Sequence, residues 1–153
     1  KYLDHIIYYL DILKTMLSGS FVAARFLSLV AHFVITITIF WAKDTNVLAC
    51  LPLQYTQTEY DSKNTELIVG LSLTIAFLVL EFGGFIGGVS MFNSTATMLS
   101  IVAHACAAIS LSMFVIDSWD CDKFWYVFGF CSALPAFIEI CVVIGVLGFR
   151  ADK

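Results

Sequence analysis

The chain has 153 residues, of which 60% are hydrophobic and 13% are charged, and its formal net charge is -4. This composition is too apolar for a soluble globular domain of this size, so it predicts a membrane protein whose first partner is lipid. The acidic balance lies in loops and ends without a basic run, which argues against nucleic acid as a partner and against a polybasic lipid anchor.

Residues 1–20 form an N-terminal segment before the first long apolar stretch. From Lys1 to Thr15, apolar side chains recur on one helical face and charged side chains on the other, a pattern that suits a helix lying on a membrane surface. The alternative is that this segment is dispensable and that the working protein starts at Met16. We expect no cleavable signal peptide, because the first apolar stretch is too long for the apolar region of one.

Four apolar stretches follow, and each is about as long as the roughly 20 residues that a helix needs to cross a bilayer. They cover residues 22–41, 66–92, 96–116 and 124–149. We therefore predict an all-α membrane protein whose transmembrane domain, residues 21–150, is a four-helix bundle. Residues 151–153 form a short tail.

An internal repeat indicates how the bundle is organised. The hexapeptide LSLVAH at residues 27–32 returns as LSIVAH at residues 99–104, and each copy belongs to a helix that is followed by a loop and by a helix with a glutamate. The chain therefore has the pattern of two tandem helical hairpins.

The distribution of Lys and Arg predicts that both termini lie in the cytoplasm. Five of these residues lie on the side of the termini, namely Lys1, Lys14, Arg25, Arg150 and Lys153. Three lie on the opposite side, namely Lys43, Lys63 and Lys123.

Each predicted span carries one ionisable residue, in the order His32, Glu81, His104, Glu139. At about 1.5 Å per residue, all four lie roughly 12 to 15 Å deep, so they are expected to meet in one polar layer. Small and hydroxylic residues share their helix faces, as expected where helices pack closely. The second span adds two GxxxG spacings, Gly83 to Gly87 and Gly84 to Gly88.

Two interpretations of this layer stay open. It forms either a proton relay or ion site, or a set of His to Glu hydrogen bonds that fix the register of the bundle. Two His and two Glu are also a ligand set for zinc, but no metal-motif spacing supports a metal site. Because no nucleophile with a base, phosphate-binding glycine loop or paired-carboxylate cleft is evident, we expect neither an enzyme nor a cofactor.

Two features lie in the loops. Cys50 and Cys121 are on the same side of the predicted membrane, where a disulfide would join the hairpins if that side is oxidising; two free thiols are the alternative. Asn93, Ser94 and Thr95 form a glycosylation sequon in the turn between the second and third spans. The competing interpretation is that Asn93 is only a turn or helix-capping residue.

Several stretches combine into a recognisable pattern: RFLSLVAH at 25–32, ACLPL at 49–53, EYD at 59–61, GGVSMFNST at 87–95 and FCSALPA at 130–136. Together they resemble the transmembrane protein 107 family of ciliary tetraspanning proteins. The resemblance implies a non-enzymatic component of the ciliary transition zone that supports cilium assembly, gating of ciliary membrane proteins and Hedgehog signalling. The implied partners are membrane proteins of the Meckel and tectonic module, with self-association left open.

Overall fold

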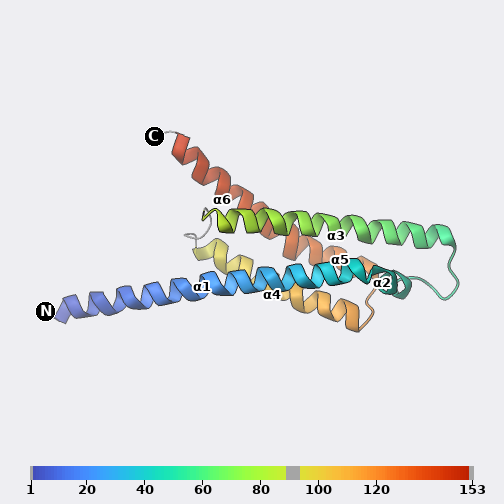
Figure 1. Cartoon of the computed structure of the whole chain (residues 1–153), viewed down its shortest axis with the longest axis horizontal. Helices are drawn as coiled ribbons and strands as arrows, with labels where there is room; N and C mark the ends of the chain where they lie inside the picture. Colours follow the sequence, from blue (N-terminus) through green and yellow to red (C-terminus); the bar gives the residue numbers. More distant parts are fainter. Residues whose placement is uncertain (1, 89–93, 152–153) are drawn as a thin grey trace.

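The computed structural model describes residues 2–88 and 94–151, and within these ranges the protein is helical without a β-strand. Four helical stretches are long and apolar enough to cross a membrane: Gly19–Trp41, Gln57–Ile86, Ser94–Ile116 and Cys121–Val146. The predicted all-α class with four spans is therefore confirmed. We call the end where α1 enters the bundle and α6 leaves it the terminal end, and the opposite end, beside α2, the disulfide end (Figure 1).

The first helix, α1 (Tyr2–Trp41), is one helix of 40 residues. It includes the N-terminal segment, which is continuous with the first span and extends past the other helices at the terminal end (Figure 1). Gly19 lies at the junction, and one glycine costs about 1 kcal/mol without ending a helix. The short α2 (Lys43–Ala49) follows almost directly.

The second span, α3 (Gln57–Ile86), differs from its prediction at both ends. It begins at Gln57 rather than at residue 66 because Thr56 and Glu59 form a capping box, in which each side chain accepts a hydrogen bond from the other residue's backbone N–H. It ends at Ile86 rather than at residue 92. Gly88 follows with a φ of 70°, a conformation that glycine adopts without strain and that stops a helix.

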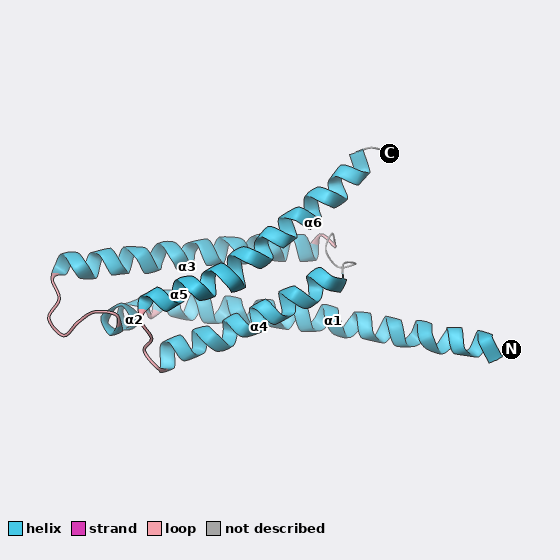
Figure 2. Ribbon diagram, turned by 180° about the vertical axis from the view of Figure 1, so that it is seen from behind, coloured by secondary structure: helices cyan, strands magenta, loops and turns pink. Residues whose placement is uncertain are grey.

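The last two spans are α4 (Ser94–Ile116) and a composite helix made of α5 (Cys121–Phe128), the π-helical turn η1 (Gly129–Ala133) and α6 (Leu134–Ala151). Proline lacks a backbone N–H, and its ring clashes with the carbonyl four residues earlier in a regular α-helix. For Pro135 that carbonyl belongs to Cys131, inside the π turn. The wider turn accommodates the proline, and the helix changes direction there (Figure 2).

The helices that carry the repeated hexapeptide, α1 and α4, run side by side in the same direction and make the most extensive helix pair of the bundle (Figure 1). The helices α3 and α6 run in the opposite direction; α3 packs against α1 and α6, and α6 also packs against α4. Near the disulfide end the buried side chains form an apolar core of Ile39, Val47, Leu67, Leu71, Leu111, Phe114 and Phe124.

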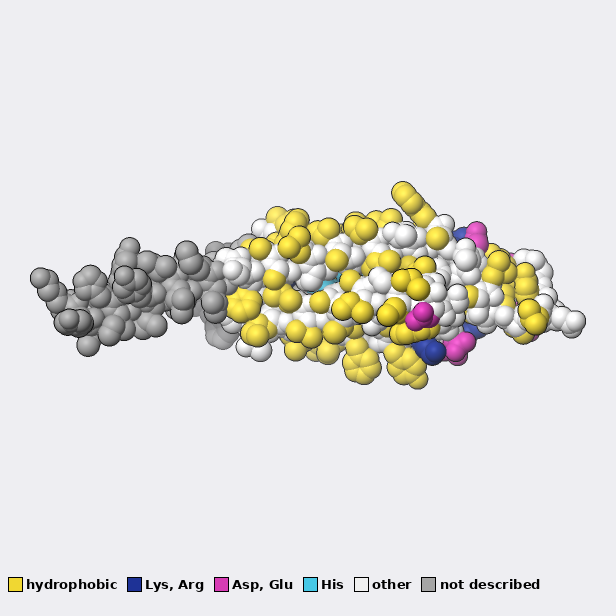
Figure 3. Space-filling model, turned by 90° about the horizontal axis from the view of Figure 1, so that it is seen from below, with side chains coloured by type: hydrophobic (Ala, Val, Ile, Leu, Met, Phe, Trp, Pro, Cys, Tyr) yellow, Lys and Arg dark blue, Asp and Glu magenta, His cyan; other side chains and the backbone are white. Residues whose placement is uncertain are grey.

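The outer surface of the bundle is apolar, as expected for helices that face lipid. In Figure 3 hydrophobic side chains cover most of the visible described face, and the charged side chains gather near one end. Large exposed apolar residues occur on every span, for example Leu27, Val79, Val102 and Phe137. We therefore expect the polar residues within the spans to lie in the interior of the bundle.

Candidate functional site

Six polar side chains from four helices meet inside the bundle, and we call them the interior polar cluster. Each of the six is at most 3% exposed. They are Arg25, His32, Glu81, Ser100, His104 and Glu139. A charged side chain in mid-membrane costs on the order of 3 kcal/mol unless it turns inward and pairs. The ionisable side chains of the cluster turn inward, and each contacts another polar side chain.

The histidine tier of the cluster joins three helices. His32 Nδ1 on α1 lies 3.0 Å from His104 Nδ1 on α4. The other ring nitrogen of His104, Nε2, lies 2.9 Å from Glu81 Oε2 on α3. The two histidines end the two copies of the repeated hexapeptide, so the parallel, in-register packing of α1 and α4 brings them face to face. Because a hydrogen bond joins two Nδ1 atoms, one ring donates and the other accepts.

The arginine tier lies closer to the terminal end. Arg25 Nη2 donates to Glu139 Oε2 over 2.8 Å, and both side chains are at most 2% exposed. Arg25 Nε also donates to Ser100 Oγ at 3.2 Å, and the guanidinium lies 5.6 Å from the centre of the Phe85 ring. One arginine on α1 thus contacts side chains of α3, α4 and α6.

The interior polar cluster differs from the predicted single layer with His to Glu hydrogen bonds. One such pair forms, between His104 and Glu81, but Glu139 pairs with Arg25 and His32 contacts His104. Arg25 and His32 are seven residues apart on α1, which separates the two tiers by about 10 Å along the helix. The four predicted residues do reach the interior, on two levels instead of one.

Arg25 is the member of the cluster that sequence reasoning missed, because it was counted only as a positive charge near the terminal end. The signal for its role is the helical spacing. Residues seven apart on an α-helix lie on the same face, two turns from each other, so Arg25 shares the face of His32. A cation on that face, inside an apolar stretch, needs an anion from another span.

Among the predicted packing glycines, Gly84 lies at a close approach between chain segments. A Cβ on Gly84 would lie 2.1 Å from Glu139 Oε1, so glycine at this position gives the Glu139 carboxylate its place against α3. In contrast, a Cβ on Gly83 or Gly88 would meet no atom within 4 Å. Gly87 is the exposed C-cap of α3.

Some polar atoms of the interior have no hydrogen-bond partner among the described residues. They are His32 Nε2, Glu81 Oε1, Glu139 Oε1, Thr97 Oγ1 and Ser132 Oγ. A buried polar atom without a partner costs about 1–3 kcal/mol. The cluster therefore specifies which helix faces meet more than it adds net stability.

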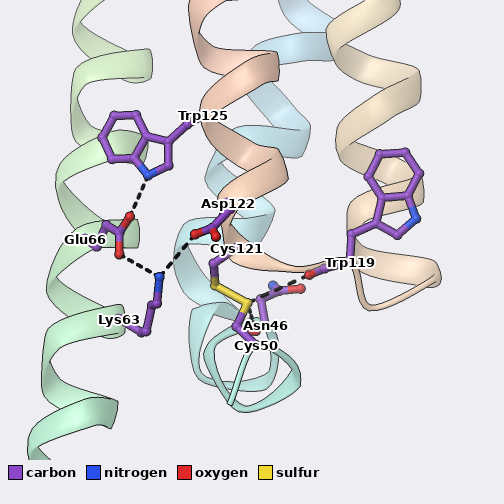
Figure 4. Close-up of polar contacts among 8 residues, drawn as sticks. All are labelled: Asn46, Cys50, Lys63, Glu66, Trp119, Cys121, Asp122 and Trp125. Carbon is purple, nitrogen blue, oxygen red and sulfur yellow. Dashed lines mark hydrogen bonds and ion pairs between the residues drawn. A yellow bond between two sulfur atoms is a disulfide. The ribbon is translucent and has the colours of Figure 1, made fainter. Parts of the chain in front are cut away.

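The disulfide end holds its helices in another way (Figure 4). Cys50 and Cys121 form a disulfide that joins the segment after α2 to the first residue of α5. Beside it, Lys63 Nζ of α3 donates to Asp122 Oδ1 of α5 at 3.2 Å and to Glu66 Oε2 at 3.1 Å. The indole N–H of Trp125 donates to Glu66 Oε1 at 2.8 Å. These contacts link α3 to α5.

A separate polar contact ties α2 to α3. Asp44 Oδ1 accepts hydrogen bonds from Lys43 Nζ at 2.9 Å and from the Tyr60 hydroxyl at 3.1 Å. The hydrogen bond from Lys43, followed by that from Tyr60, lowers the pKa of the Asp44 carboxyl, since both donors favour its charged form. The predicted sequon residue Asn93 lies outside the described residues.

Comparison with known proteins gives a consistent result. A family model described as "TMEM107: Transmembrane protein" matches residues 21–143, a range that includes the whole interior polar cluster. Curated proteins named "Transmembrane protein 107" are similar to the chain. The Xenopus laevis protein is 50% identical over 132 residues (86% of this chain and 94% of the relative). The Homo sapiens protein is 47% identical over 129 residues (84% and 92%). No solved structure gives a significant match.

Proposed function

This chain belongs to the transmembrane protein 107 family, and from that premise we propose that it is a non-enzymatic structural component of a membrane complex at the ciliary transition zone. In this role it supports cilium assembly and helps to control which membrane proteins enter the cilium. The observation that carries the proposal is the family match over residues 21–143, together with a relative that is 50% identical over 86% of the chain. The expected partners are other membrane proteins of the transition zone, of the Meckel and tectonic type.

The packing of the interior favours the role of a scaffold over that of a channel. The side chains of His32, Glu81 and His104 are 0% exposed, so no open path leads from the surface to the histidine tier in this structure. The Arg25–Glu139 pair closes the bundle on the terminal side, and the apolar core closes it on the side of the disulfide. A rigid bundle with an apolar outer surface suits lateral assembly with other membrane proteins.

We infer the orientation from the disulfide. Disulfides persist in the secretory lumen and outside the cell, whereas cytosolic thiols are kept reduced. The Cys50–Cys121 bond lies at the end opposite the start of the α1 span and the end of α6. The disulfide end is therefore assigned to the lumen or exterior and the terminal end to the cytoplasm, in agreement with the positive charges.

The proposal is tested by tagging the C-terminus and imaging it beside a transition-zone marker in ciliated cells. We expect a focus at the ciliary base, and proximity labelling in the same cells should recover transition-zone membrane proteins. An even distribution over the endoplasmic reticulum or plasma membrane, without enrichment of such proteins, would contradict the proposal.

The second candidate function is a proton-coupled transporter or channel. It is motivated by the continuous chain of hydrogen bonds from His32 through His104 to Glu81. The two imidazole rings of this chain can exchange tautomers and so pass a proton along it. Reconstitution in proteoliposomes tests it. A pH-dependent flux that the double change Glu81→Gln with Glu139→Gln abolishes would favour this candidate over the scaffold.

A further inference from the structure

A cleft of about 320 Å³ opens at the disulfide end, apart from the interior polar cluster. The Cys50–Cys121 disulfide forms part of its wall, and its other described lining residues are Lys63, Asp120, Asp122, Lys123 and Tyr126. Its volume is near the lower end of the roughly 300–1,000 Å³ range of small-ligand sites.

The cleft lies at the border between the polar and the apolar part of the bundle. On α5 the charged residues Asp122 and Lys123 come directly before the buried Phe124. On α3 the buried apolar run begins at Leu67, one turn after Lys63. Tryptophan and tyrosine prefer the headgroup level of a membrane, and Tyr126, which is 70% exposed, lies in the cleft wall. A lipid headgroup therefore has direct access to the cleft.

The charges of the cleft favour a zwitterion over an anion. Lys63 and Lys123 supply two positive charges, and Asp120 and Asp122 supply two negative charges. Glu66, hydrogen-bonded to Lys63, adds a further negative charge at the edge. A site with no net positive charge does not attract an anionic headgroup, whereas a group that carries both charges can complement both pairs.

Both cleft lysines keep N–H donors that are not used in hydrogen bonds within the cleft. An ammonium has three N–H donors, and Lys63 directs two of them to Glu66 and Asp122. Lys123 Nζ lies 3.7 Å from Asp120 Oδ2, longer than a good hydrogen bond, and 5.5 Å from the centre of the Trp119 ring. Each ammonium therefore keeps an N–H donor for a phosphate oxygen. The Asp120 and Asp122 carboxylates, 78% and 80% exposed, stay open to an ammonium group.

We propose that this cleft binds the headgroup of a zwitterionic phospholipid, phosphoethanolamine or phosphocholine, from the adjacent leaflet. The phosphate lies at Lys63 and Lys123, and the ammonium lies at Asp120 and Asp122, with the Tyr126 ring able to contact a quaternary ammonium. The disulfide anchors the first residue of α5 to the segment after α2, and the Lys63–Asp122 hydrogen bond joins α5 to α3 across the cleft. This site is independent of the ciliary role proposed above.

Native mass spectrometry of the purified full chain tests the proposal. The protein in detergent is mixed in turn with phosphatidylcholine, phosphatidylethanolamine and phosphatidylglycerol, and the retained lipid is counted. We expect the two zwitterionic lipids to be retained in preference to the anionic one. Lys63→Gln should weaken this retention roughly tenfold, since it removes a charged donor to the phosphate. Equal retention of all three lipids would overturn the proposal.

The matched control is Lys43→Gln, which removes another lysine of the disulfide end that pairs with Asp44 and does not line the cleft. It should leave lipid retention unchanged; an equal loss in Lys43→Gln and Lys63→Gln would mean that general surface charge is responsible. Because Lys63 also links α3 to α5, Lys123→Gln serves as the second cleft variant. Unchanged lipid retention in both cleft variants, with unfolding temperatures like wild type, would overturn the site.

A competition arm separates the membrane source from a soluble one. Glycerophosphocholine carries the same headgroup without acyl chains, so an excess should displace phosphatidylcholine from the wild type. Capture of glycerophosphocholine by a protein that retains no phospholipid would assign the cleft to a soluble phosphodiester and overturn the lipid proposal.

Discussion

The two ends of the bundle are held together by opposite means. At the terminal end, a dry ion pair between Arg25 and Glu139 joins α1 to α6, and both side chains are almost completely buried. At the disulfide end, the solvent-exposed Lys63–Asp122 pair joins α3 to α5, and its side chains are 34% and 80% exposed. A covalent bond between Cys50 and Cys121 lies beside it.

The difference follows from how water screens charge. An exposed ion pair contributes about 0–1 kcal/mol to the free energy of unfolding, so polar contacts alone do not fix the disulfide end. The disulfide supplies the additional stability there. A buried pair interacts strongly, but its formation has to offset the desolvation of both partners. The terminal end is therefore specific in its arrangement and intolerant of losing one partner.

The largest expected effect comes from breaking the buried pair on one side. Arg25→Leu leaves the Glu139 carboxylate buried without its cation, and we expect it to destabilise the protein by about 3–5 kcal/mol. The measurement is the free energy of unfolding in detergent micelles. A loss below about 1 kcal/mol would show that water reaches this end and that the contrast between the two ends is false.

The double variant sharpens this test. When Arg25→Leu is combined with Glu139→Leu, no charge is left without a partner, and the double variant should be more stable than Arg25→Leu alone. Strictly additive losses from the two single changes would contradict the direct pairing seen at 2.8 Å.

The next largest effect is expected from the covalent bond. Cys50→Ser opens a link between residues 71 positions apart. The chain-entropy model gives about 4 kcal/mol for such a loop, an upper bound because insertion in a membrane already restricts the unfolded chain. We expect a lower unfolding temperature, a mobility shift on non-reducing gels and a newly labelled Cys121 thiol. Cys106→Ser, at an exposed free cysteine within α4, is the control and should change none of these.

The sequence predicted the fold more fully than the contacts inside it. Hydrophobic length was enough for the four spans, because it is a local signal in the chain. The repeat predicted two tandem hairpins, but it did not predict that His32 and His104 contact each other. The partner of Glu139 depends on how α6 leaves its π turn and on the close approach that Gly84 permits. These are tertiary features, and no spacing within one helix reports them.

Gly84 itself gives a third, smaller effect at the terminal end. In Gly84→Ala the new methyl group would overlap the Glu139 carboxylate and disturb its bond with Arg25, so we expect a loss of about 1–3 kcal/mol. The neighbouring Gly83→Ala is the matched control, because its Cβ meets nothing within 4 Å and alanine favours a helix. Unfolding in micelles should separate the two variants. Equal stability of both would place Glu139 away from α3.

The smallest effect is expected where an interior glutamate does not face a fixed cation. In Glu81→Gln the side chain keeps an oxygen that can accept from His104 Nε2, so the change should cost no more than about 0.6 kcal/mol, the average for a hydrogen bond between membrane helices. Glu139→Gln removes the anion opposite Arg25 and should cost several times as much, although the chemical change is the same. Unfolding free energies of the two variants, measured side by side, distinguish the tiers. If the two losses are equal, the histidine tier also holds a permanent charge pair, with His104 as an imidazolium ion.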